Sequence, residues 1–130
     1  MFSWPAAVPA TLTAVHPVLP SQNVAVSIDF YVERIGFRLL GRDSESDTRY
    51  AVVARDSVEL HIQWHDPDEW SAVERPMLRL LVSSTEQLFD EFSGASVFHA
   101  GTALRETPWG TREFAFYDPY KNGLTFYEDL

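Results

Sequence analysis

The chain has 130 residues, of which 45% are hydrophobic, and nineteen acidic against ten basic side chains give it a net charge of −9. This length supports one domain with a sizeable core, and the composition is that of a globular protein. No apolar run approaches the roughly 18 residues of a membrane span. The absence of cysteine excludes disulfides, thiolate metal sites and a cysteine nucleophile. The acidic balance argues against nucleic acid as a partner and favours cationic ligands, although it also keeps proteins soluble.

The first ten residues indicate an N-terminal arm over 1–10, with Pro5 and Pro9 among small apolar side chains. This segment lacks the basic flank of a signal peptide, so we expect a cytoplasmic protein that makes no membrane contact. The alternating residues 11–19 predict a β-strand that Pro20 closes.

The first half of the chain continues with a helix and three strands. Apolar residues recur at helical spacing between a cap at Asn23 or Ser21 and Gly36, which suits the left-handed residue after a helix end. They predict a helix over 23–35. Strands are predicted over 37–42, 49–54 and 57–64, the last two joined as a hairpin at Arg55-Asp56.

The strand over 57–64 alternates cleanly between two faces. One face is apolar, with Val58, Leu60, Ile62 and Trp64, and the other is polar, with Glu59, His61 and Gln63. We expect the apolar face to pack on the core and the polar face to be available to a ligand.

The same order of elements repeats after a polar linker over 65–75. A strand over 77–82 leads to a helix that begins at Ser83 or Ser84, with Glu86 or Gln87 three residues later as a capping box, and that ends at Gly94. Short strands are predicted over 96–100, 103–106, 112–117 and 124–128.

Both halves therefore run strand, helix and then several strands, which indicates a repeated βαβββ unit, and the two helix caps lie about sixty residues apart. Such a unit leaves one face of its sheet uncovered, so two units must pair to bury it. We predict a single-domain α+β fold with module one over 11–64 and module two over 76–130.

Three segments of the chain carry a resemblance to a known family. They are Val15 to Pro20 with Ser27-Ile28-Asp29-Phe30-Tyr31 through Gly36-Phe37; Val58 to Ile62; and Glu106 to Glu128, with Pro-Trp-Gly-Thr-Arg-Glu-Phe, Asp-Pro…Asn-Gly and Leu-Thr-Phe-Tyr-Glu. Together they resemble the vicinal oxygen chelate superfamily, which includes glyoxalase I, extradiol dioxygenases and the bleomycin- and fosfomycin-resistance proteins. The last segment is most similar to the bleomycin-resistance type. Lys121 departs from the family's turn, which usually has glycine there.

The resemblance implies a homodimer whose curved mixed sheets wrap around concave grooves. Binding members of the superfamily use these grooves to sequester a cationic glycopeptide antibiotic, with no chemistry and no protein-bound metal. In such dimers the N-terminal arm can cross to the partner, and the alternative is a frayed terminus.

In the enzymes of the superfamily, four residues from the first and last strands of each half hold a divalent metal. The resemblance places the first two positions on His16 and Glu59, which are competent ligands. The other two fall on Met77 and Thr125, or on Arg79 and Tyr127 if the register slips by two. These are poor donors for such metals, so a hydrogen-bonded His16, with Glu59 as one possible partner, is the favoured interpretation.

The remaining candidates suit a planar, cationic ligand, since aromatic rings beside carboxylates offer stacking and cation–π contacts. We predict a ligand site that includes Trp109 at a turn and the side chains of Glu59, His61, Gln63, Arg79, Phe37, Tyr50 and Phe114. Core packing is an equal alternative for Phe37, Tyr50 and Phe114. A buried Arg79 needs a carboxylate partner, either Glu59 or Glu113.

Two functional hypotheses follow. The first is a dimeric protein that sequesters a cationic or aromatic antibiotic-like molecule without turnover and without a cofactor. The second is a metal-dependent lyase, isomerase or dioxygenase that uses His16 and Glu59. A third possibility is a sensor or interaction module that keeps only the fold.

Overall fold

The computed structural model describes residues 8–130. Its elements, in chain order, are β1 (Val18–Ser21), α1 (Val24–Asp29), the π-helical turn η1 (Phe30–Arg34), β2 (Arg38–Arg42), β3 (Tyr50–Arg55), β4 (Val58–Trp64), α2 (Pro67–Trp70), β5 (Met77–Leu81), α3 (Thr85–Ser93), β6 (Arg105–Glu106), β7 (Thr111–Tyr117) and β8 (Gly123–Asp129). Among these residues, no helix has the length and hydropathy of a membrane span.

The two halves fold into sheets of the same topology. The first sheet has the strand order β1-β4-β3-β2 and the second has β5-β8-β7-β6. In each, the first strand runs parallel to the last one, and the remaining pairs are antiparallel. The repeated strand–helix–strand pattern of the sequence therefore corresponds to two βαβββ sheets in an α+β fold.

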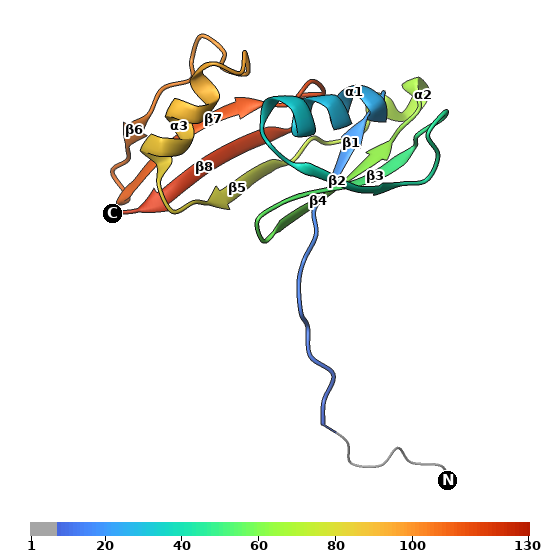
Figure 1. Cartoon of the computed structure of the whole chain (residues 1–130), viewed down its shortest axis with the longest axis horizontal. Helices are drawn as coiled ribbons and strands as arrows, with labels where there is room; N and C mark the ends of the chain where they lie inside the picture. Colours follow the sequence, from blue (N-terminus) through green and yellow to red (C-terminus); the bar gives the residue numbers. More distant parts are fainter. Residues whose placement is uncertain (1–7) are drawn as a thin grey trace.

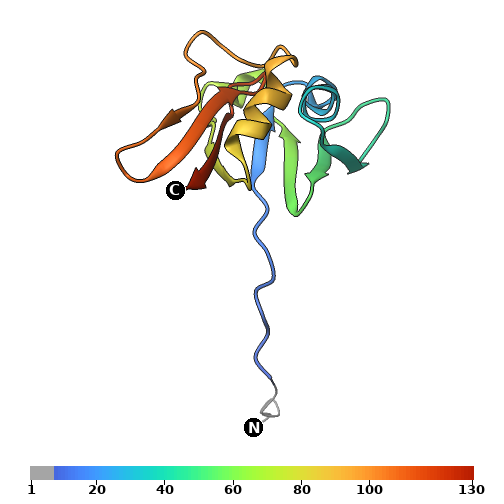
Figure 2. The ribbon, with the colours of Figure 1, turned by 60° about the vertical axis from the view of Figure 1, so that its left-hand side comes forward.

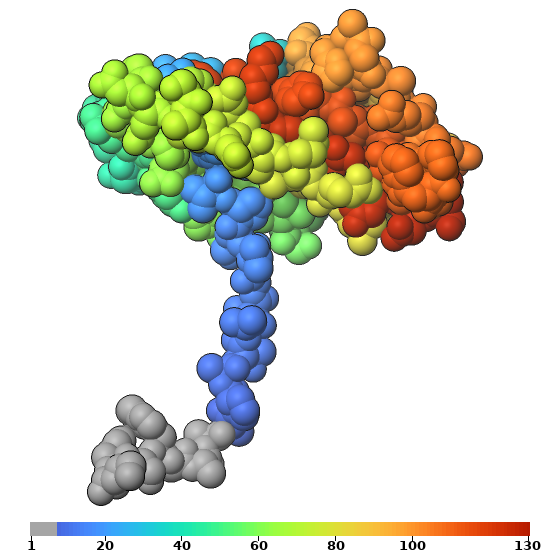
Figure 3. Space-filling model, turned by 180° about the vertical axis from the view of Figure 1, so that it is seen from behind, coloured from blue at the N-terminus to red at the C-terminus, as the bar shows by residue number. Residues whose placement is uncertain are grey.

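The two sheets sit side by side, and the helices α1 and α3 lie on the same side of them (Figures 1 and 2). The hydrophobic core fills the space between the helices and the sheets and runs through both halves. The first half contributes Tyr31 and Phe37, and the second contributes Phe92, Phe114 and Phe126. The face of each sheet opposite the helices has no cover within residues 8–130, and we call it the open face. Residues 8–15 project away from the body on that side (Figures 1 and 3).

Local signals set the helix ends. The Asn23 side chain accepts a hydrogen bond from the Val26 amide at the start of α1, and Gly36 follows the helix with φ of +76°. Ser84 accepts from the Gln87 amide at the start of α3, so the second of the two predicted caps is the one used. The predicted helix over 23–35 is confirmed, although its last turn is the π-helical η1.

The turn Asp118–Asn122 joins the two halves. The Asp118 carboxylate accepts hydrogen bonds from the Tyr31 hydroxyl (2.8 Å), from Asn122 Nδ2 (2.8 Å) and from the Tyr120 and Asn122 amides. Asn122 Nδ2 also donates to the Pro20 carbonyl of β1. Lys121 takes the glycine-like conformation that the turn needs, with φ of +70°.

Burial perturbs both acids in this contact. It raises the pKa of Asp118, against the opposing effect of the hydrogen bonds from Asn122 and Tyr31. It also raises the pKa of Tyr31 well above its usual value, with a further contribution from the neighbouring Asp118 charge. The Asp-Pro…Asn segment is thus a buried structural contact between the halves.

Three predicted elements differ from the structure. The strand over 11–19 begins only at Val18. Within the part of the chain that the structure describes, the residues before it pair with no strand, apart from one bond from the His61 amide to the Pro17 carbonyl. Residues 96–100 are not a strand: Ser96 has a positive φ of 59°, and Val97 and Phe98 pack on the core from an irregular loop. The 103–106 strand shortens to β6.

The linker over 65–75 contains the short helix α2, which the sequence analysis did not predict. Asp66 caps it, and Glu69 completes a capping box with Pro67 in the first turn. The signal for this helix, Asp-Pro-x-Glu, was present in the sequence but lay within a stretch too short and polar to suggest a helix.

Candidate functional site

Polar side chains cluster on the open face of the first sheet. Leu60 and Ile62 of β4 point into the core, so Glu59, His61 and Gln63 project from the opposite face. Glu59 Oε2 lies 2.8 Å from His61 Nε2, and the Tyr50 hydroxyl lies 2.6 Å from His61 Nδ1. The register of β3 and β4 places Tyr50 opposite Gln63. Four predicted site residues are therefore neighbours.

His16 joins this cluster from the segment before β1. Its Nε2 is 3.2 Å from Glu59 Oε2, and its ring stacks on that of His61 with 5.2 Å between centroids. The parallel pairing of β1 with β4 brings the two histidines together, since Val18 is in register with His61. Glu59, the partner considered for His16 in the sequence analysis, is therefore its neighbour, in an ion-pair contact.

Arg79 lies in the second sheet, where it pairs with a buried carboxylate. Its Nη2 is 3.1 Å from Oε2 of Glu113, which is only 7% exposed, and its guanidinium lies 4.3 Å from the ring centre of Tyr127. The Thr111 hydroxyl also donates to Glu113. Of the two partners considered for Arg79, the structure selects Glu113.

Trp109 stands at the tip of the β6–β7 hairpin and is 67% exposed. Gly110 beside it has φ of +89°, and paired bonds between Thr107 and Thr111 close the loop. The predicted position of Trp109 at a turn is confirmed, and the structure shows its side chain exposed to solvent. Its role in binding stays a prediction.

Phe37 and Phe114 belong to the core, in line with the alternative stated for both. Phe114 is 2% exposed and packs against Phe89, Phe92 and Phe126, while Phe37 is 5% exposed and contacts Tyr31 edge-on. Neither presents its ring on an open face, so a ligand on that face cannot reach them without rearrangement of the core.

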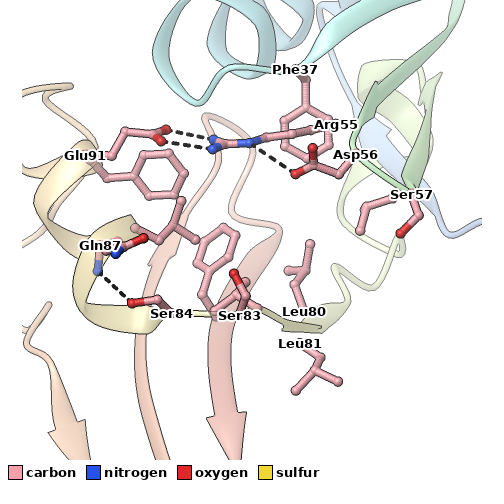
Figure 4. Close-up of a pocket in the computed structure, with 15 residues that line it drawn as sticks. Phe37, Arg55, Asp56, Ser57, Leu80, Leu81, Ser83, Ser84, Gln87 and Glu91 are labelled. Carbon is pink, nitrogen blue, oxygen red and sulfur yellow. Dashed lines mark hydrogen bonds and ion pairs between the residues drawn. The ribbon is translucent and has the colours of Figure 1, made fainter.

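Phe37 also lines a cavity of about 280 Å³ on a different part of the molecule (Figure 4). This cavity lies between the Arg55–Ser57 turn and α3, and an Arg55–Glu91 ion pair with contacts of 2.7 and 2.9 Å crosses it. Its lining includes none of the polar residues of the β4 cluster.

The four positions that hold metal in the superfamily's enzymes do not fit a metal in this chain. The Met77 side chain folds over Gly123, with its sulfur 2.5 Å from the place where a Cβ would stand, and accepts a bond from the Thr125 hydroxyl at 3.2 Å. A thioether and a neutral hydroxyl are weak donors for borderline or hard divalent ions. Arg79, the alternative to Met77, forms an ion pair with Glu113. Only His16 and Glu59 of the four are competent ligands.

The contact of His16 with His61 was missed at the level of sequence. The signal lay in combining the alternation of the 57–64 strand with a parallel pairing of the first and last strands of the module. Without a register, the distance between His16 and His61 could not be stated.

Comparison with known proteins agrees with this architecture. The profile of the Glyoxalase/Bleomycin resistance protein/Dioxygenase superfamily matches residues 13–126. A bleomycin resistance protein of Geobacillus stearothermophilus is 25% identical over 130 residues, which cover 88% of this chain and 95% of that protein.

Solved structures give the same result. The bleomycin-binding protein from bleomycin-producing Streptomyces verticillus, complexed with copper(II)-bleomycin, is 25% identical with a TM-score of 0.74, covering 91% of this chain and 97% of that one. A bleomycin resistance determinant encoded on transposon Tn5 has a TM-score of 0.76 at 19% identity, covering 91% and 98%, and shows the shared fold. This chain belongs to the glyoxalase/bleomycin resistance protein/dioxygenase superfamily.

Proposed function

We propose that this protein is an antibiotic-binding member of its superfamily, which sequesters a cationic or aromatic molecule of the bleomycin kind without turnover. The observation that carries the proposal is the open face of the first sheet, where the Glu59 carboxylate, two imidazoles and Tyr50 stand together outside the core. A carboxylate beside flat rings suits a planar cation through ion pairing, stacking and cation–π contact. The similarity to bleomycin resistance proteins supports the same class of ligand.

The electrostatics point in the same direction. The net charge of −9 attracts a cationic ligand and raises its local concentration. In the second sheet, Arg79 is already neutralised by Glu113, so it adds no free positive charge that would oppose such a ligand. Trp109, exposed at the hairpin tip, offers a further stacking surface.

A homodimer completes this proposal. The open faces carry the exposed apolar side chains of Val18, Met77, Leu81 and Tyr117, and those of Val8, Leu12 and Val15 on the arm are almost fully exposed. A second copy of the chain is the simplest cover for this apolar surface. The arm crossing expected from the resemblance belongs to the same proposal; Pro5 lies outside the described residues.

The test is calorimetric titration of chelator-treated protein with metal-free and copper(II)-loaded bleomycin, together with its tryptophan fluorescence. We expect saturable binding, and Glu59→Gln weakens it by a factor of roughly 2–30, the equivalent of about 0.5–2 kcal/mol for a cation contact. Glu45→Gln, an exposed carboxylate in the β2–β3 loop, is the matched control and leaves affinity unchanged. An absence of heat and of any fluorescence change at high micromolar bleomycin would exclude this ligand.

The oligomeric state has a separate test. Sedimentation or light scattering should give twice the monomer mass of 14.8 kDa. A monomer at all accessible concentrations would contradict the dimer without bearing on the ligand.

A further inference from the structure

Three side chains with competent ligand atoms lie close together on the open face of the first sheet. We propose that His16 Nε2, Glu59 Oε2 and His61 Nε2 together form a site for one divalent transition-metal ion of the zinc, nickel or copper kind. These atoms lie within 4.8 Å of one another. The set is confined to a single sheet and needs no residue of the second half, unlike the superfamily's four positions. The site shares Glu59, His16, His61 and Tyr50 with the proposed antibiotic-binding cluster, but its test uses the metal ion alone and does not require an antibiotic to bind.

The two distances to Glu59 are close to those of donors that share an ion. Two atoms that each lie about 2.1 Å from a metal are about 3.0–3.4 Å apart in octahedral or tetrahedral coordination. Glu59 Oε2 is already 2.8 Å from His61 Nε2 and 3.2 Å from His16 Nε2. Only the two imidazoles must reorient, because their planes are 11° from parallel. The His16 side chain, 39% exposed and outside any strand, has room to tilt.

The donor chemistry selects the class of ion. Two imidazoles and one carboxylate suit Zn²⁺, Ni²⁺ and Cu²⁺ and are a poor set for Ca²⁺ or Mg²⁺, which prefer oxygen ligands. Three protein donors leave at least one coordination position for water or another donor. The acidic character of the chain favours a dication over an anion at the same place.

Tyr50 gives His61 the partner that metal-bound histidines require. Because an ionised carboxylate only accepts, His61 Nε2 donates to Glu59 in the metal-free state and Nδ1 accepts from the Tyr50 hydroxyl. A metal on Nε2 moves the ring proton to Nδ1, and the same hydroxyl then rotates to accept it. A hydroxyl can support both tautomers, and a ligating histidine commonly has such an outer partner.

The first experiment uses untagged protein, stripped with a chelator and desalted. Titration calorimetry with Zn²⁺ should show one ion per chain with micromolar or tighter affinity. The electron paramagnetic resonance spectrum of the Cu²⁺ form should show couplings to imidazole nitrogens of two histidines. No saturable binding, or a Cu²⁺ spectrum without two imidazoles, would overturn the proposal even if no variant could be purified.

The second experiment assigns the ligands. His61→Ala and Glu59→Gln each weaken Zn²⁺ binding at least tenfold, and Tyr50→Phe weakens it by about 10–100-fold through the outer contact. His65→Ala and His99→Ala are matched controls, since the remaining two histidines lie outside the cluster. Unchanged binding in His61→Ala, or binding lost instead in Thr125→Ala, would assign the ion elsewhere and refute the proposal. Circular dichroism of each metal-free variant verifies its fold.

Discussion

Tyr31 and Asp118 lie 87 positions apart in the chain, and a 2.8 Å hydrogen bond joins their side chains inside the protein. One comes from the helical segment of the first half and the other from the β7–β8 turn of the second. The Asp118 carboxylate also accepts hydrogen bonds from the Asn122 side chain and from two backbone amides, and the Asn122 side chain donates to the Pro20 carbonyl. These bonds hold the two halves in one arrangement. That arrangement leaves both open faces on the same side of the chain.

Replacement of Tyr31 by phenylalanine should weaken this junction. The change removes one donor to a buried carboxylate, so we expect a loss of about 1–3 kcal/mol in the free energy of unfolding, measured by chemical denaturation. Tyr120→Phe is the control, because its hydroxyl donates to no residue within 8–130 and the variant should stay within about 0.5 kcal/mol of the original. Equal effects of the two substitutions would refute the role given to Tyr31.

The Arg55–Glu91 ion pair should give a pH-dependent contribution to stability. The Arg55 hydrogen bonds lower the pKa of Glu91 from its ordinary 4.5. A lowered folded pKa means that the stabilisation is fully present above pH 4.5 and is lost as the pH falls through the folded value. The pair is partly exposed and screened, so Glu91→Gln should cost only about 0.5–1 kcal/mol at neutral pH.

Denaturation curves of the original protein and Glu91→Gln at several pH values test this expectation. The difference between them should shrink below pH 4.5. Asp90→Asn, next to it on α3 and in no ion pair within the described residues, should show no such difference. If the difference in free energy of unfolding stays constant into strong acid, the contribution of Glu91 to stability does not depend on its charge.

Trp109 should matter for ligand binding and not for folding. Because the ring is exposed, Trp109→Ala should change the free energy of unfolding by no more than about 0.5 kcal/mol. If the ring stacks on bleomycin, affinity falls by about 0.5–2 kcal/mol in the same titration. Trp70→Ala is the control: Trp70 contacts Tyr120 and Arg75, away from the hairpin tip, so affinity should hold. Equal affinities for Trp109→Ala and the original protein would exclude this ring as a contact.

Phe114 should show the opposite behaviour. Its ring lies among five other phenylalanines of the second half, and its removal leaves a cavity, so Phe114→Ala should lower the free energy of unfolding by about 3–5 kcal/mol. Phe114→Leu serves where the alanine variant does not fold. A stable variant with weakened bleomycin binding would instead make Phe114 a ligand contact.

The sequence by itself determined the elements whose signals are local. The helix starts, each narrowed to two candidate caps, the glycine at 36 and the alternation of residues 57–64 depend on near neighbours in the chain and agree with the structure, which selected Asn23 and Ser84 as the caps. The strands were predicted less accurately than the helices, because a strand also needs a neighbouring strand with which to pair. Residues 11–17 and 96–100 have suitable side chains but no adjacent strand within residues 8–130, so they stay irregular.

The tertiary structure alone decided which side chains meet. The parallel register of β1 on β4 brought His16 to Glu59 and His61, and the side-by-side sheets separated that cluster from Arg79 and Glu113. The alternation of residues 57–64 and the family resemblance identified most of these residues as candidates. Their distances depend on contacts between segments far apart in the chain, which local patterns do not specify. The sequence thus named the candidates for the site, and the packing of the sheets decided which of them act together.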